Sequence, residues 1–182
     1  VERHGRQVVA ETRSEVGNLY PDIPIDVGDA TAKGKTANLF DKKVGARMLR
    51  PIAYLWTRTI PSPARGFERA MVPLVRQTWL RRKAGAFVAA KPIVDRQNLT
   101  LCWEIIESAA KTEKAAIVEW GFDPAGLSTR GATTCPFSGT PVTSKEVKVA
   151  GMAGTLSHSL MAIVCVEPGK RGKRYLPPET LP

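Results

Sequence analysis

The sequence Cys-Pro-Phe-Ser-Gly at residues 135–139 has the form of half a zinc-binding knuckle that lacks one of its two ligands. A knuckle needs two thiolates a few residues apart, followed by a glycine, so that the backbone of the turn folds under the metal. Here Ser138 stands at the second sulfur position, and its hydroxyl binds Zn²⁺ poorly. Residues 60–66, Ile-Pro-Ser-Pro-Ala-Arg-Gly, have the same proline-rich, glycine-ended form without any cysteine. Two interpretations follow: a zinc-ribbon framework whose metal site has decayed, or two ordinary Pro/Gly turns and one isolated cysteine.

Several other sequence runs along the chain are informative because of the order in which they occur. The most distinctive of these runs is Val-Pro-Leu-Val-Arg-Gln-Thr-Trp-Leu at residues 72–80. The others lie at residues 1–5, 17–21, 54–59, 83–92, 147–154, 160–164 and 170–178. In this order the runs resemble the middle section of large bacterial adenine-specific DNA methylases, which carry an inserted zinc ribbon and in some cases are linked to phage defence. The resemblance covers nearly the whole chain.

The resemblance implies a metal site that has lost most of its ligands. Family members place cysteines at four positions, which in this chain are Ile60, Arg65, Cys135 and Ser138. A structural Zn²⁺ ion needs four ligands, so we expect no bound zinc and regard Cys135 as the remnant ligand position. We expect the apolar side chains of Ile60, Phe137 and Val142 to hold the two turns together instead.

The same resemblance implies a region without catalytic parts. In the family the cofactor loop precedes this region and the catalytic motif follows it, so S-adenosylmethionine belongs to the intact enzyme. The tetrapeptide Asp-Pro-Ala-Gly at residues 123–126 lacks the second proline and the aromatic residue with which amino-methyltransferases hold a flipped adenine, and it predicts an ordinary turn. We therefore expect a non-catalytic inserted region, inactive alone, that binds or positions DNA beside a catalytic methyltransferase domain of the same or a companion chain.

Two other functional classes stay open. One is a stand-alone module that binds nucleic acid or protein, with a role in phage defence. The other is an enzyme with an unrecognised site, although no pairing of a nucleophile with a base is visible in the sequence.

The charge of the chain indicates a polyanionic partner. Its 27 Lys and Arg residues exceed its 17 Asp and Glu residues, which gives a formal net charge of +10 and is typical of nucleic-acid-binding domains. The candidate contacts form two clusters, Arg76, Arg81, Arg82 and Lys83 around Trp79, and Lys170, Arg171, Lys173 and Arg174 beside Tyr175. Such cations neutralise phosphates while an exposed aromatic ring offers a stacking surface. The alternative is that these are solvated turns, with Trp79 buried and Arg76 paired with Glu68 or Glu104.

The composition is that of an ordinary globular protein. Hydrophobic residues make up 43% and charged residues 24% of the 182 residues, and no apolar run is long enough to span a bilayer. The N-terminus carries no secretion signal, and three cysteines form no paired framework. We therefore expect a cytoplasmic protein with no membrane partner.

The hydrophobic patterning predicts an α+β fold with a small antiparallel sheet, an N-terminal helix and one or two further helices. The turn motifs and the resemblance add degenerate zinc-ribbon-like knuckles to this sheet. We expect an N-terminal helix and irregular linker over residues 1–50 and a β-rich domain over 51–182. Helices are predicted at residues 2–16, near 37–44 and at 144–157. Strands are predicted at residues 52–59, 71–79, 86–92, 99–106, 116–120, 160–166 and 174–176. Residues 104–114 fit a helix equally well.

Overall fold

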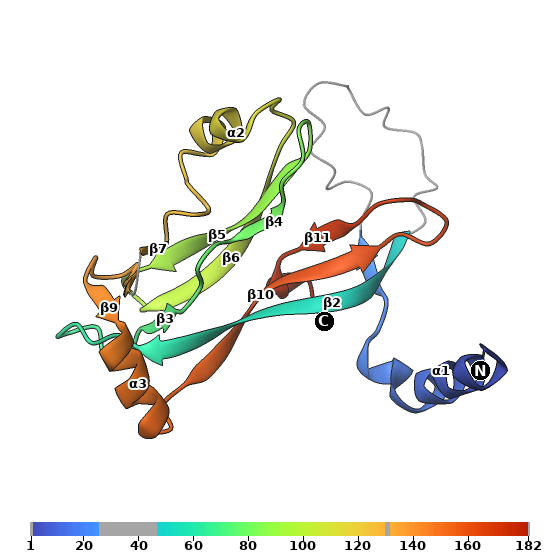
Figure 1. Ribbon diagram of the computed structural model, residues 1–182, viewed down its shortest axis with the longest axis horizontal. Helices are drawn as coiled ribbons and strands as arrows, with labels where there is room; N and C mark the ends of the chain where they lie inside the picture. Colours follow the sequence, from blue (N-terminus) through green and yellow to red (C-terminus); the bar gives the residue numbers. More distant parts are fainter. Residues whose placement is uncertain (1, 26–46, 130–131, 182) are drawn as a thin grey trace. The chain divides into compact units, whose positions relative to one another are not determined.

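The computed structural model describes residues 2–25, 47–129 and 132–181, and it has the α+β class that the sequence predicts (Figure 1). Antiparallel strands dominate, and three α-helices lie in the part of the chain that the structure describes. The chain divides into two compact units. The first contains the described residues up to Ala53 together with residues 164–174 and 180–181, and the second contains the described residues from 54 to 163 together with residues 175–179.

The first unit begins with helix α1, Glu2–Val16, at the predicted position. None of its side chains is buried by the described residues. A short 3₁₀ turn, Gly17–Leu19, follows, and strand β1, Ile23–Ile25, then pairs antiparallel with strand β2, Arg47–Pro61. Residues 23–25 and 47–50, predicted as part of an irregular linker, therefore lie in strands. Ile23 and Leu49 are fully buried partners across β1 and β2. The helix predicted near residues 37–44 lies outside the described residues.

The larger sheet has the strand order β1-β2-β10-β11, and β3 also pairs with β2. Strand β3 is Met71–Pro73, β10 is Ser157–Val166 and β11 is Arg174–Leu176. Strands β10 and β11 confirm the predicted strands at residues 160–166 and 174–176. The middle of β10 is almost wholly buried, as the run of apolar residues there predicts.

A second sheet contains strands β4, Trp79–Arg81, β5, Phe87–Asp95, and β6, Thr100–Ser108, in that order. The continuous strand predicted at residues 71–79 is wrong, because β3 pairs with β2 whereas β4 pairs with β5. Pro73 ends β3 and has no N–H to donate to a ladder. The backbone N–H of Thr78 instead donates to the carbonyl of Pro124 at 2.9 Å.

The strand predicted at residues 116–120 is also wrong, since residues Glu113–Trp120 form helix α2. The Thr112 side chain accepts a hydrogen bond from the N–H of Ala115 at the helix start, and Gly121 ends the helix with a left-handed φ of 57°. Helix α3, Ser144–Met152, is shorter than predicted, because Gly154 adopts a φ of 69°. None of the described helices is long and apolar enough to cross a membrane.

The two turns predicted to meet do so around one apolar cluster. Strands β8, Ala132–Thr134, and β9, Pro141–Thr143, flank the second turn, and β7, Ser128–Thr129, pairs with β8. The three apolar residues expected to hold the turns, Ile60, Phe137 and Val142, are at most 2% exposed and lie in one buried cluster with Cys135. The prediction that side-chain packing joins the turns is confirmed.

Replacing Phe137 by alanine tests how much this cluster stabilises the fold. We expect Phe137→Ala to lower the free energy of unfolding by about 3–5 kcal/mol, since it removes a buried ring and leaves a cavity. Urea denaturation measures the change. Val118→Ala is the control, because Val118 is 80% exposed and should change stability by less than about 0.5 kcal/mol. Similar stabilities of the two variants would contradict the proposed role of the cluster.

Candidate nucleic-acid interface

Ser62 and Cys135 are in contact where the two turns meet. The Ser62 Oγ and Cys135 Sγ atoms are 3.4 Å apart, and both side chains are buried. Residues 62–66 and 135–139 share the pattern X-Pro-X-X-Gly, and the final residues, Gly66 and Gly139, have φ values of 85° and 74°. Glycine adopts this left-handed conformation without a steric penalty, so both turns have the same local design.

Ser62, and not Ile60, lies against the remnant ligand position Cys135 in the structure. Ile60 belongs to the apolar cluster, whereas Ser62 contacts the sulfur of Cys135. The spacing from Ser62 to Arg65 also equals the spacing from Cys135 to Ser138. Ser62, Arg65, Cys135 and Ser138 are therefore the corresponding positions of the two turns.

Hydroxyl and backbone donors surround the Cys135 sulfur. Burial raises the pKa of this thiol, but hydrogen bonds from Ser138, Ser62 and the backbone of residues 137 and 138 together outweigh it, so the pKa lies below its ordinary value. The Ser138 hydroxyl also donates to Oγ1 of Thr140 at 3.1 Å and accepts from the Thr140 N–H at 3.3 Å. Burial without such donors raises the pKa of Cys165 to about 11.

The four positions around Cys135 do not fit a zinc ion. Two hydroxyls and a guanidinium replace three of the thiolates that a structural site requires. Throughout the described part of the chain, no group of three or more His, Cys, Asp and Glu side chains could hold a metal. The hydrogen bonds to Cys135 and the apolar cluster therefore connect the turns in this chain.

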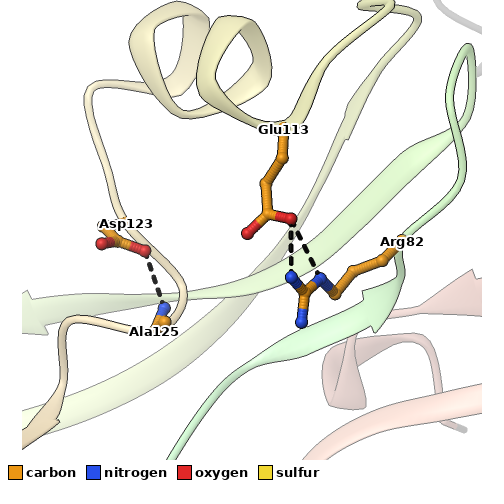
Figure 2. Close-up of polar contacts among 4 residues, drawn as sticks. All are labelled: Arg82, Glu113, Asp123 and Ala125. Carbon is orange, nitrogen blue, oxygen red and sulfur yellow. Dashed lines mark hydrogen bonds and ion pairs between the residues drawn. The ribbon is translucent and has the colours of Figure 1, made fainter.

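Among the predicted DNA contacts, Arg82 is held by an internal ion pair (Figure 2). Its Nη2 and Nε atoms lie 2.6 and 3.2 Å from Oε2 of Glu113, at the start of α2. Its guanidinium carbon also lies 5.6 Å from the ring centroid of Trp79. Arg82 thus links β4 to α2, and this role reduces its availability to a phosphate.

Trp79 packs within an aromatic group instead of offering a free ring. Its ring centroid is 5.4 Å from that of Trp120 and 5.9 Å from that of Phe87, and its Nε1 atom is buried without a hydrogen-bond partner in the described chain. This supports the alternative in which the indole is structural. The same alternative expected Arg76 to pair with Glu68 or Glu104, and this part is wrong. Arg76 is exposed, and the described residues contain no ion pair between it and either glutamate.

Three cations of the first cluster are available to a ligand. Arg76, Arg81 and Lys83 are exposed, and none of them forms an ion pair within the described ranges. All three belong to the second compact unit. We use the name "β4 cations" for this group of three residues.

The second predicted cluster forms a turn in the first unit. Lys170 Nζ lies 2.8 Å from Glu167 Oε1, and Arg171, Lys173 and Arg174 are exposed. Gly169 and Gly172 have positive φ values of 78° and 113°, as a glycine-containing turn before β11 requires. Tyr175, at the other side of the unit boundary, donates its hydroxyl proton to the Leu80 carbonyl at 3.1 Å.

The structure adds an aromatic residue that the sequence did not single out as a contact. Trp56 in β2 is 59% exposed, and Arg58, two residues later, is exposed on the same face of the strand. Thr57 and Thr59 point to the opposite face and are buried. The alternation of Tyr54, Trp56 and Arg58 with Thr57 and Thr59 along a predicted strand is the sequence pattern that could have placed Trp56 and Arg58 on one face. A tryptophan this exposed, beside a guanidinium, is typical of a binding surface.

The turn at residues 123–126 has an ordinary structural role. The Asp123 carboxylate accepts a hydrogen bond from the N–H of Ala125 at 2.9 Å (Figure 2), and the N–H of Gly126 donates to the Asp123 carbonyl. Pro124 is fully buried. These contacts form a capped turn, as the sequence predicts.

Comparisons with protein families, with curated proteins and with solved structures find no significant match to this chain.

Placing thiolates at the four matched positions of the two turns tests their geometry. We expect Ser62→Cys/Arg65→Cys/Ser138→Cys to bind one Zn²⁺ ion, because together with Cys135 it supplies four thiolates at two matched turns. Elemental analysis, the absorption spectrum of the Co²⁺ form and a rise in Tm on adding zinc measure the gain. The matched control is Ile60→Cys/Arg65→Cys/Ser138→Cys, which should bind metal more weakly and unfold more easily. Equal or tighter binding by the control would contradict the assignment of Ser62.

Proposed function

We propose that this chain is a non-catalytic DNA-binding region of an adenine-specific DNA methyltransferase. The resemblance of the ordered sequence runs supports the methyltransferase part of the proposal. The chemistry of one surface in the second unit supports DNA binding. The observation that carries it is the exposed indole of Trp56, with Arg58 beside it on the same strand face.

Stacking explains why such a ring would be left in water. Burying an indole in the core is favourable, so a tryptophan that is 59% exposed leaves much apolar surface in contact with solvent. A base offers a flat π-face that covers this surface, and a neighbouring guanidinium can bind the adjoining phosphate. The indole of Trp79 is less suited to this role, because Phe87, Trp120 and Arg82 surround it.

The charge of the chain segment that follows Trp56 favours a phosphate backbone. Residues 58–83 contain seven basic residues and one acidic residue: Arg58, Arg65, Arg69, Arg76, Arg81, Arg82 and Lys83 against Glu68. The single carboxylate accepts a hydrogen bond from Gly66 in its own turn. A segment this basic attracts DNA through counterion release, which positions the protein without reading sequence.

This role fits a division of labour in a methyltransferase. A catalytic domain must extrude the target adenine from the duplex, and the DNA must be held while it does so. In this proposal the exposed cations bind the backbone, and the ring of Trp56 beside Arg58 stacks on an unpaired base. In this proposal the catalytic domain, on the same or a companion chain, supplies S-adenosylmethionine and methyl transfer.

Removal of the exposed ring tests the stacking part of the proposal. We expect Trp56→Ala to weaken binding of a single-stranded oligonucleotide by roughly 5- to 150-fold, which corresponds to about 1–3 kcal/mol for one stacked base, and to weaken duplex binding less. Fluorescence anisotropy measures both affinities. Trp56→Phe should retain part of the affinity, and Met152→Ala, at an apolar position that is 80% exposed on α3, should retain all of it. If Trp56→Ala binds like the Met152 control, Trp56 does not contact DNA.

Neutralising the β4 cations tests the electrostatic part. We expect Arg76→Gln/Arg81→Gln/Lys83→Gln to weaken duplex binding and to lower the slope of log K against log salt by about 0.9 for each phosphate that the variant no longer neutralises. The Arg82–Glu113 ion pair stays intact in this variant. The matched control, Lys111→Gln/Lys114→Gln/Lys148→Gln, removes the same charge from exposed positions elsewhere. Equal salt slopes for the two triple variants would show that net charge alone, and not this surface, attracts DNA.

A further inference from the structure

A cavity of about 340 Å³ opens in the second unit. Its wall includes Thr59 of β2, Thr100 at the start of β6 and residues 157–159 at the start of β10. Its size lies at the lower end of the range of small-ligand sites, about 300–1,000 Å³. No Asp or Glu side chain lines it among the described residues.

Two side chains suited to an anion face this cavity. Arg69 and His158 both line it. Both are exposed, and neither forms an ion pair with a carboxylate in the parts of the chain that the structure describes. A guanidinium presents several N–H donors in a planar fork that matches the oxygens of a phosphate, and an imidazole adds a further donor. The cavity therefore has a cationic side without a competing internal anion.

Hydroxyl groups add uncharged donors to the same wall. The Ser159 Oγ accepts a hydrogen bond from Nε1 of the buried Trp103 at 3.3 Å. This contact uses an acceptor site of Ser159 and leaves its own proton free for a ligand. Thr100 and Ser157 also line the cavity. Thr59 of β2 lines the cavity as well, and its side chain is 3% exposed.

The remaining wall is apolar. It contains Met71, Pro73, Leu99 and Leu101. Leu99 has a φ of 55°, in the left-handed region that glycine or asparagine usually occupies. Its side chain packs against the apolar cluster of Ile60 and Phe137 as well as lining the cavity.

We propose that this cavity binds a nucleotide. Arg69 and His158 bind the phosphate, the hydroxyls of Ser157 and Ser159 donate to it or to the sugar, and the apolar wall packs against the base. The inference is independent of the Trp56 surface. The nucleotide comes either from a nucleic-acid strand or from a free mononucleotide, since both present the same chemistry.

Titration of the full chain with AMP tests the site. We expect saturable binding by calorimetry, NMR shifts at Arg69 and His158, and weaker binding of inorganic phosphate, which lacks the base. Arg69→Gln should weaken AMP binding at least about tenfold, the loss expected when a charged hydrogen bond to the ligand is removed, and Ser157→Trp should block the cavity from an exposed position. The control is Arg65→Gln, an exposed arginine outside the cavity. Absence of saturable AMP binding, or equal affinities of the Arg69 and Arg65 variants, would overturn the proposal.

Competition identifies the source of the nucleotide. If a short single-stranded oligonucleotide displaces AMP from the wild-type chain, the cavity takes one nucleotide of a strand. If both ligands bind together, the cavity takes a free mononucleotide. Both results support the site, and a loss of DNA binding in Trp56→Ala with unchanged AMP binding would separate it from the DNA-binding surface.

Discussion

The contact between the turns at residues 62–66 and 135–139 organises the second unit. It joins segments that lie 73 residues apart at the Ser62–Cys135 pair, and a short Pro/Gly turn has too little surface to fix its own position. In small zinc-binding modules the metal supplies this connection, with a free energy on the order of 10 kcal/mol. Here the turns share an apolar cluster that also includes Ala70, next to β3, and Ala150 of α3. Burial of side chains thus performs the role that coordination bonds perform in a metal-bound knuckle.

The chemistry of each cysteine depends on the donors around it. Cys135 and Cys165 are both fully buried, yet the pKa of Cys135 lies below its ordinary value and that of Cys165 is raised to about 11. The difference arises from the hydroxyls and backbone N–H groups that face Cys135, because donors stabilise a thiolate whereas an apolar environment does not.

The surroundings also decide which tryptophans and arginines are available to a ligand. Trp79 is packed against Phe87 and Trp120, whereas Trp56 leaves more than half of its surface in solvent. Arg82 is held by Glu113, whereas Arg76 and Arg81 carry no such partner among the described residues. A cation that already has a carboxylate partner gains less from a phosphate, because binding must first break the existing pair. The proposed DNA contacts are therefore those that the fold leaves without partners.

The sequence by itself determined the elements whose signal is local. Helix α1 lies where composition and a glycine stop predict it, and β10 lies where a run of apolar residues predicts a buried strand. The α+β class also follows from short-range patterns, whereas the meeting of the two turns was expected only from the resemblance to a zinc ribbon. Tertiary structure decided the rest. Residues 71–81 divide into β3 and β4 because their partners lie in different sheets, and Glu113–Trp120 is helical although its composition also suits a strand. Ser62, and not Ile60, contacts Cys135, and Trp56 is the exposed ring in place of Trp79. In each case the outcome depends on which distant segment covers a side chain or pairs with a backbone, and spacing along the chain does not contain that information.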